Sequence, residues 1–211
     1  DTIVFESWKG RQYSDNPRAV FEELERRGDP RRRVWAVEHL GVEVPDGVER
    51  VIVGSREYFR HIARARWLVT NDSMPPHYVK RGGAKYAQTW HGTPLKRIHH
   101  DVLLAPPGRL DYLDRDVARW DVLLSPNPAS TPRLRKAFGF DGPVWETGYP
   151  RNDRLVGPLA GATRTAVRRE LGLADDERVV LYAPTWRDDE KYDQSVRDVP
   201  MHLHLGALAA R

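Results

Sequence analysis

Short apolar runs alternate with helical patterns along the first 150 residues, and this alternation most constrains how the chain can fold. Helical patterns cover 56–65, 130–139 and 16–28, and the last of these has Asn16 at its start and Gly28 at its end. The apolar runs predict strands at 2–7, 33–39, 50–55, 66–72, 85–91, 121–127 and 143–150. Strands that alternate with helices are typical of a parallel α/β sheet. We therefore predict a doubly wound, Rossmann-like domain.

A change of composition predicts a second unit. Prolines and glycines are concentrated at 149–163, which suits a linker between domains. A helical pattern at 164–172, an apolar run at 178–184 and the first turns of a second helix at 203–211 follow it. The predicted organisation is a Rossmann-like domain over 1–158, then a linker and the incomplete start of a second Rossmann-like domain over 159–211. Because one strand and two helices bury too little surface for a stable domain, we expect the sequence to be a piece of a longer protein.

Composition narrows the chemistry that the chain can perform. Cysteine is absent, which excludes disulfides, thiolate nucleophiles and cysteine-ligated zinc, and which fits a reducing compartment. The sequence shows neither a signal peptide nor a run of about 20 apolar residues, so we expect neither secretion nor a membrane span. The net charge is +4, and 28 of the 34 basic residues are arginine. This charge favours phosphates, whether on a soluble ligand, a nucleic acid or an anionic membrane face.

Five polar loops follow predicted strands, which is where open parallel sheets bind ligands. They cover 6–17, 71–81, 90–101, 148–153 and 184–189. Because the carboxyl ends of parallel strands share one edge, we expect the first four loops to line the same edge of one sheet. The segments concerned are 7–16, 71–80, 91–96 and 148–153. The fifth loop would face them across a cleft if the second unit is also Rossmann-like.

His91 is the strongest single candidate for chemistry. Imidazole can accept a proton near neutral pH, and the end of a strand gives it access to substrate. In the motif HGTPLK, Gly92 leaves room for a ligand and Lys96 adds positive charge. The alternative is a histidine that only makes hydrogen bonds within a turn. The residues that follow it favour the catalytic interpretation.

Two further loops carry charged side chains with more than one interpretation. In GYPRND, Arg151 or Asn152 could bind phosphate at the floor of a cleft, or the segment could be an Asx-type turn in a linker. In PTWRDD, Arg187 could bind phosphate. The carboxylates of Asp188 and Asp189 could cap or solvate that loop, or bind Mg²⁺ weakly.

The adjacent histidines His99 and His100, followed by Asp101, raise the question of a metal site. Neighbouring side chains in a helix or strand point apart, and no second cluster of ligands is evident in the sequence. We therefore predict no zinc site there.

Four motifs, in this order, resemble those of the CDP-glycerol glycerophosphotransferases, which include the teichoic acid glycerol-phosphate primases and polymerases. The motifs are FESWKGRQYSDNPRAVFEEL, QTWHGTPLKRI, ETGYPRND and LYAPTWRDD, and they cover nearly the whole chain. The resemblance implies a GT-B architecture, in which two Rossmann-like domains face each other across a cleft. Residues 1–158 would form the acceptor side, and 159–211 would begin the nucleotide-binding domain.

The resemblance also implies a reaction. An acceptor hydroxyl attacks the β-phosphate of CDP-glycerol and releases CMP, as in the synthesis of teichoic acid or capsule-type polymers. His91 matches the histidine of the HGTPLK motif and is inferred to be the general base. The residues expected to bind substrate within the matched motifs are Gly92, Thr93, Lys96, Arg151, Asn152, Asp153, Thr185 and Arg187.

The sequence departs from the family pattern in two ways. The family uses another histidine and further nucleotide-binding residues in the later part of its second domain, which this sequence does not include. In addition, RIHHD places two histidines where a less basic pair is expected. Relatives that handle ribitol phosphate share these motifs, so the polyol stays open.

The expected partners are CDP-glycerol, or a related CDP-polyol, and a lipid-linked polyol-phosphate acceptor. No cofactor is required by the motifs, and participation of Mg²⁺ stays open. We expect a cytoplasmic location, peripheral to the inner face of the bacterial plasma membrane through regions outside this chain, and no binding to nucleic acid. Two alternatives remain: a GT-B glycosyltransferase that uses a sugar nucleotide, and a non-catalytic basic module that docks on a membrane or nucleic acid.

Overall fold

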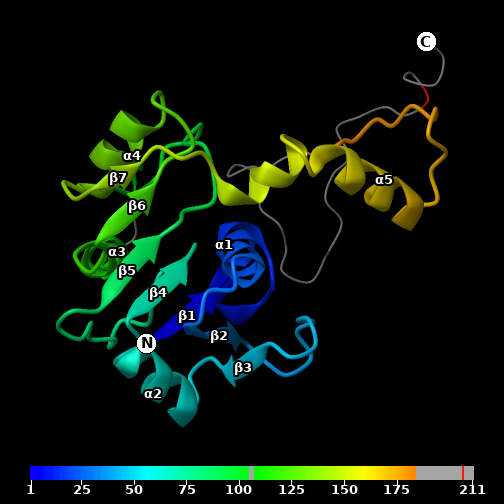
Figure 1. Cartoon of the computed structure of the whole chain (residues 1–211). Helices are drawn as coiled ribbons and strands as arrows, with labels where there is room; N and C mark the ends of the chain where they lie inside the picture. Colours follow the sequence, from blue (N-terminus) through cyan, green and yellow to red (C-terminus); the bar gives the residue numbers. More distant parts are fainter. Residues whose placement is uncertain (105–106, 184–205, 207–211) are drawn as a thin grey trace. The chain divides into compact units, whose positions relative to one another are not determined.

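A sheet of seven parallel strands organises the chain in the computed structural model, which describes residues 1–104, 107–183 and 206 (Figure 1). The strands are β1 (Thr2–Glu6), β2 (Arg32–Val37), β3 (Glu49–Ile52), β4 (Trp67–Thr70), β5 (Lys85–Gln88), β6 (Val122–Leu124) and β7 (Val144–Trp145). Their spatial order is β3-β2-β1-β4-β5-β6-β7. The predicted parallel α/β sheet is confirmed. The strands end earlier than predicted because polar residues after them, such as Thr89 to His91 after β5, belong to loops.

Helices connect the strands, as a parallel sheet requires. The α-helices are α1 (Asp15–Arg26), α2 (Arg56–Arg64), α3 (Arg109–Val117), α4 (Thr131–Phe138) and α5 (Ala160–Glu170), and the 3-10 helices are η1 (Trp8–Gly10), η2 (His99–Asp101) and η3 (Pro150–Leu155). The sequence did not predict α3, because its apolar pattern is weak and, among its apolar side chains, only Val117 is buried. Within the described part of the chain, no helix combines the length and the apolar character needed to cross a bilayer.

The centre of the sheet is buried on both faces. β1 lies between β2 and β4, and its side chains alternate between two hydrophobic cores. Ile3 and Phe5 pack on one face with Phe21 of α1. Val4 packs on the other face with Tyr58 of α2. Chain order reverses between β1 and β4, and open α/β sheets bind ligands beyond the carboxyl ends of the strands at such a point.

The chain divides into two compact units, 1–167 and 168–211, and the division falls inside α5. The sequence predicted a boundary after residue 158, so the proposed domain limits stay a prediction. The strand predicted at 178–184 is wrong for its described part, because 178–183 form no strand. The side chains of Val180 and Leu181 are exposed, and no strand among the described residues pairs with this segment. An apolar run forms a strand only where a neighbour pairs its backbone groups.

Candidate active site

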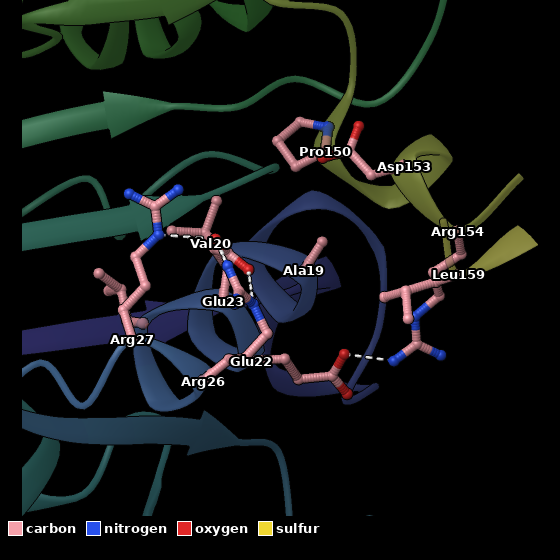
Figure 2. A pocket seen from close by; sticks show the side chains of 11 residues that line it. Ala19, Val20, Glu22, Glu23, Arg26, Arg27, Pro150, Asp153, Arg154 and Leu159 are labelled. Carbon is pink, nitrogen blue, oxygen red and sulfur yellow. Dashed lines mark hydrogen bonds and ion pairs between the residues drawn. The ribbon is translucent and has the colours of Figure 1, made fainter. Parts of the chain in front are cut away.

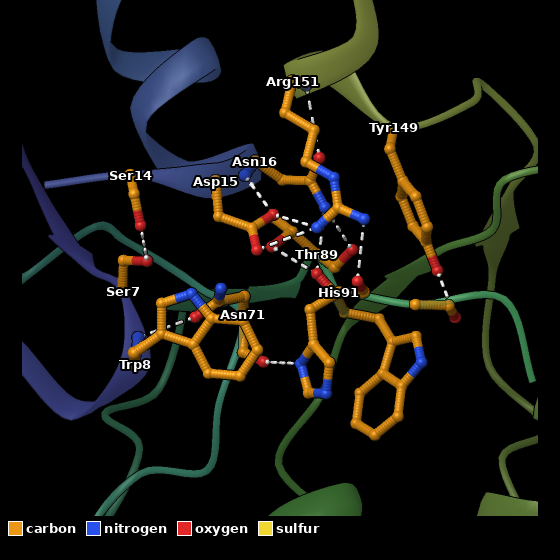
Figure 3. Close-up of polar contacts among 12 residues, drawn as sticks. Ser7, Trp8, Ser14, Asp15, Asn16, Asn71, Thr89, His91, Tyr149 and Arg151 are labelled. Atoms are coloured by element: carbon orange, nitrogen blue, oxygen red, sulfur yellow. Dashed lines mark hydrogen bonds and ion pairs between the residues drawn. The ribbon is translucent and has the colours of Figure 1, made fainter. Parts of the chain in front are cut away.

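Loops that follow β1, β4 and β5 meet at the carboxyl edge of the sheet (Figure 3). The backbone N–H of Trp8, after β1, donates to Oδ1 of Asn71, after β4, at 2.9 Å. The backbone carbonyl of Asn71 lies 2.7 Å from Nδ1 of His91, after β5. The loop after β7 joins them, because Arg151 donates to the backbone carbonyl of His91 at 2.8 Å. The prediction that these four loops share one edge is confirmed.

The ring of His91 is held in one orientation and one tautomer. It stacks on Trp90, with ring centroids 4.0 Å apart, and also contacts Trp8 at 4.6 Å. Because the carbonyl of Asn71 can only accept a hydrogen bond, Nδ1 of His91 carries the proton and Nε2 carries the lone pair. Burial lowers the pKa of His91 below 6.5, against the opposing effects of the Asn71 hydrogen bond and nearby carboxylates. His91 is therefore neutral at pH 7, with Nε2 able to accept a proton.

Arg151 ties the amino end of α1 to the loop that carries His91. Its Nη1 donates to both carboxylate oxygens of Asp15, at 2.7 and 2.8 Å, and its Nη2 donates to the carbonyl of His91. The Asp15 side chain is only 7% exposed, whereas that of Arg151 is 33% exposed. The guanidinium also lies over the ring of Tyr149, 5.1 Å from its centroid. Through its two terminal nitrogens, Arg151 positions the backbone of His91 as well as neutralising a buried carboxylate.

Asn16 and Tyr149 hold the backbone on either side of His91. Asn16 is fully buried, and its Nδ2 donates to the carbonyls of Trp90 at 2.9 Å and Thr89 at 3.3 Å. The hydroxyl of Tyr149 donates to the carbonyl of Gly92 at 2.8 Å. These contacts were not predicted, although both residues lie in the polar loops that the sequence singled out. They make residues 89–92 a fixed platform for the imidazole.

Unusual backbone conformations gather at this platform. Among the described residues, five non-glycine residues have positive φ, and Trp8, Asp15 and Trp90 are three of them, at 51°, 62° and 51°. A left-handed conformation costs a residue with a side chain roughly 1–2 kcal/mol, so it persists only where surrounding contacts impose it. Strain of this kind is typical of functional sites, and here it sets the directions from which Trp8 and Trp90 contact His91.

Of the other residues predicted to bind substrate, one belongs to this platform, four lie on exposed segments and two lie outside the described residues. A Cβ added at Gly92 would meet nothing within 4 Å, so the space at this glycine is open. Thr93 and Lys96 are exposed on the segment that follows. Asn152 and Asp153 are exposed on η3, outside the contacts drawn in Figure 3. The predicted residues Thr185 and Arg187, with Asp188 and Asp189, lie outside the described residues.

Comparison with known proteins places this arrangement in a family. The sequence profile of CDP-glycerol:poly(glycerophosphate) glycerophosphotransferases matches residues 1–207. The chain belongs to this family. All four loops around His91 lie within the matched region, and the resemblance inferred from the four motifs is confirmed.

Individual members of the glycerophosphotransferase family match most of the chain. This chain is 39% identical to a teichoic acid poly(glycerol phosphate) polymerase from Staphylococcus epidermidis over 90% of this chain and 28% of the relative. It is 38% identical to a teichoic acid glycerol-phosphate transferase from Staphylococcus aureus over 98% of this chain and 55% of the relative. Among solved structures, a histidine-to-asparagine variant of the wall teichoic acid polymerase TagF, soaked with CDPG, has a TM-score of 0.88 at 36% identity, over 99% of this chain and 53% of that one. The GT-B-like α/β fold is thereby confirmed, and this chain spans about half or less of these family members.

A hollow in the surface of this family member lies away from His91. It has a volume of about 490 Å³ and is bounded by α1 and by residues between Pro150 and Leu159 (Figure 2). Its arginines and glutamates pair with one another, as Arg26–Glu23, Arg27–Glu23 and Arg154–Glu22. Because these charges are neutralised locally, the hollow attracts a phosphate less than an unbalanced basic surface would. It is therefore a weaker candidate for a phosphate site than its size suggests.

A buried acid, Glu6, ends β1 directly before the loop that carries Trp8. The hydroxyl of Tyr58 donates to Oε2 of Glu6 at 2.8 Å. Burial raises the pKa of Glu6 to about 7, the hydrogen bond from Tyr58 opposes the rise, and the nearby carboxylate of Asp72 adds to it. The stability of this family member should therefore depend on pH near neutrality.

We expect Glu6 to lower the free energy of unfolding by roughly 2–3 kcal/mol as pH rises from about 5 to about 8. The folded state holds the proton more tightly than the unfolded chain, whose carboxyl has a pKa of 4.5, so the stabilisation is present in acid and is lost as pH rises through about 7. Glu6→Gln, which stays uncharged, should remove most of this decrease in the free energy of unfolding. Urea unfolding at several pH values measures the decrease, with the surface substitution Glu57→Gln as control. Identical pH profiles for wild type and Glu6→Gln would contradict the prediction.

Proposed function

We propose that this chain supplies the acceptor side of a CDP-glycerol glycerophosphotransferase. In this proposal, 1–158 is the acceptor-side domain and 159–211 begins the nucleotide-binding domain. The enzyme transfers glycerol phosphate from CDP-glycerol to a hydroxyl of a lipid-linked or polymeric acceptor, in the synthesis of teichoic acid or a capsule-type polymer. The observation that carries the proposal is the neutral imidazole of His91 at the ligand-binding edge of the sheet. Asn71 fixes this ring so that Nε2 carries the lone pair.

The chemistry requires a base beside an acceptor hydroxyl. As the hydroxyl oxygen bonds to the β-phosphorus of CDP-glycerol, its proton passes to Nε2 of His91. The bond between that phosphorus and the oxygen bridging to the α-phosphate breaks, and CMP leaves with the bonding electrons. Since Nδ1 of His91 keeps its hydrogen bond to Asn71, the imidazolium formed is stabilised without a change of ring orientation.

A basic groove along the motif of His91 supports an acceptor that carries phosphates. The groove has a volume of about 380 Å³ and begins at Pro94, three residues after His91. Its cationic side chains are Lys96, Arg97, Arg133 and Lys136. Its one acid, Asp101, pairs with Lys136 at 2.9 Å. The excess of positive charge suits a polyol-phosphate chain or its lipid-linked diphosphate.

The remaining substrate contacts are proposed from the matched motifs. Gly92 gives the acceptor room beside His91, and Thr93 and Lys96 contact its phosphates. Arg151 binds phosphate through the guanidinium N–H groups that do not donate to Asp15 or His91. The other residues proposed to contact the donor or acceptor are Asn152, Asp153, Thr185 and Arg187. Mg²⁺ participation stays open.

The proposed location is the cytoplasmic side of the plasma membrane, where the enzyme is peripheral and meets its lipid-linked acceptor. This follows from the chemistry of the acceptor, since a lipid-linked polymer is held at a membrane. The contacts with the membrane are proposed to come from regions outside this chain. The family relative TagF soaked with CDPG supports the choice of donor.

CMP release by the full-length parent protein tests the proposal. With CDP-glycerol and a lipid-linked polyol-phosphate acceptor, we expect CMP to form together with an acceptor lengthened by one glycerol phosphate. CDP-ribitol in a parallel reaction identifies the polyol. Transfer only from a UDP-sugar would support the glycosyltransferase alternative. Salt-sensitive binding to anionic vesicles or nucleic acid, without any transfer, would support the non-catalytic module.

A further inference from the structure

His99, His100 and Asp114 form a cluster of potential metal ligands apart from His91. One ligand atom from each of the three lies within 4.8 Å of the other two. The prediction that the two histidines diverge is wrong, because their ring centroids lie 4.4 Å apart. The physical reason is the left-handed backbone of His99, with φ of 49° in η2, which turns its side chain toward that of its neighbour. α3 supplies Asp114, so two separate elements build the cluster.

The imidazole of His99 is arranged as metal-binding histidines usually are. Its side chain is 2% exposed, and its Nδ1 lies 2.9 Å from the backbone carbonyl of Ala137 in α4. Because that carbonyl can only accept, Nδ1 carries the proton and Nε2 presents its lone pair to the cluster. A hydrogen bond from the outer ring nitrogen to a backbone carbonyl is the arrangement that orients histidine ligands in metal sites.

The lone pair of His99 lacks a donor. Among the described residues, Nε2 of His99 is buried without a hydrogen-bond partner. Oδ1 of Asp114, itself an acceptor, lies 3.5 Å from it. A cation bound there would give Nε2 of His99 a partner, with Oδ1 of Asp114, which already contacts His100, as a second ligand.

We propose that His99, His100 and Asp114 bind a divalent transition-metal ion. Nε2 of His100 lies 2.7 Å from Oδ1 of Asp114, which is a hydrogen-bond distance, and it would exchange this hydrogen bond for a bond to the ion. Tetrahedral Zn²⁺ with bonds of about 2.0–2.1 Å keeps its ligand atoms roughly 3.4 Å apart, a spacing that small side-chain shifts provide here. Two imidazoles and one carboxylate select Zn²⁺ or a similar ion over Mg²⁺, which prefers oxygen ligands. The half-exposed side chains of His100 and Asp114 leave the fourth position to water.

The bound ion would join three elements at the end of the segment that carries His91. His99 and His100 belong to η2, Asp114 belongs to α3, and Ala137 places the His99 ring on α4. The ring of His99 packs 5.4 Å from that of Phe138, which in turn lies 4.7 Å from Trp90. The ion would therefore fix the segment after the HGTPLK motif at its far end. Its role in this proposal is structural and does not depend on the transfer reaction.

Zinc titration of the full chain, without an affinity tag and after removal of metal by chelation, tests the proposal. We expect one Zn²⁺ per chain by competition with a chromophoric chelator, a visible Co²⁺ spectrum typical of four-coordinate sites, and no competition by Mg²⁺. The variants His100→Ala and Asp114→Asn should each weaken Zn²⁺ binding by at least about 100-fold. Both side chains are more than 40% exposed, so these variants should fold. The exposed His39, outside the cluster, provides the control His39→Ala, which should bind like wild type.

Melting temperature gives a second readout of the same site. Zn²⁺ should raise the melting temperature of wild type and of His39→Ala, since an ion that binds only the folded state stabilises it. It should leave that of His100→Ala unchanged. The proposal is overturned if wild type binds no Zn²⁺, or if His100→Ala and Asp114→Asn bind it as tightly as wild type does. In the first case His100 and Asp114 form only a half-exposed hydrogen-bonded pair.

Discussion

His91→Ala in the full-length enzyme is expected to lower turnover by about 10²–10⁴-fold while leaving the affinity for CDP-glycerol nearly unchanged. In the proposed mechanism the side chain accepts a proton only as the acceptor oxygen closes on phosphorus, so its loss should raise the barrier without weakening donor binding. Initial rates of CMP release at saturating acceptor measure turnover. Calorimetric titration with CDP-glycerol measures affinity, and melting temperature shows that the variant is folded.

Two further variants separate this role from general damage to the site. His39→Ala, which removes an exposed histidine, should keep wild-type turnover. Arg187→Ala should instead weaken donor binding, because the guanidinium proposed to pair with the diphosphate would act in the ground state as well as in the transition state. If His91→Ala retained wild-type turnover, the HGTPLK segment would be a turn without a catalytic base.

The pH dependence of turnover offers an independent check on His91. Burial lowers its pKa below 6.5, so the neutral base should predominate at pH 7. Turnover that depends on His91 should stay level above neutrality and fall as pH drops through that lowered pKa. A rise in turnover as the solution is made acid would exclude a neutral imidazole as the base.

Arg151→Ala is expected to lower the free energy of unfolding by about 3–5 kcal/mol, because it leaves the buried carboxylate of Asp15 without its cation. The Asp15 side chain is 7% exposed, so water replaces the lost partner poorly. The carbonyl of His91 also loses its donor, and turnover should fall with stability. Urea unfolding followed by circular dichroism measures the first effect and CMP release measures the second. Arg151→Lys should recover only part of either, since an ammonium cannot reproduce the planar fork.

Arg154 provides the matched control for Arg151. Both arginines lie on η3 and pair with acids of α1, but the side chains of Arg154 and its partner Glu22 are 50% and 28% exposed. Pairs exposed to solvent contribute little, so Arg154→Ala should change the free energy of unfolding by less than about 1 kcal/mol. An equal decrease in the free energy of unfolding for the two variants would show that the ion pair of Arg151 stabilises the fold no more than that of Arg154.

Local sequence was enough to predict the parallel sheet, the positions of its strands and the edge that carries His91. Each of these depends on features within a few residues: apolar runs of strand length, the turn residues that end them, and the fact that parallel strands end at one edge. The HGTPLK motif was recognisable for the same reason. Where local patterns were weak or lacked a partner, prediction failed, as in α3 and at 178–183.

The partners of these residues came from folding. Asp15 meets Arg151 across 136 positions of sequence, and Asn71 meets His91 across 20. The periodicity of apolar residues in the sequence cannot predict such pairs, because they depend on the order of the strands in the sheet and on backbone turns such as that of Trp90. His99 and Asp114 follow the same rule, since η2 and α3 become neighbours only in the folded chain. Side chains separated in sequence acquire a common chemistry only after the sheet has fixed where their loops end.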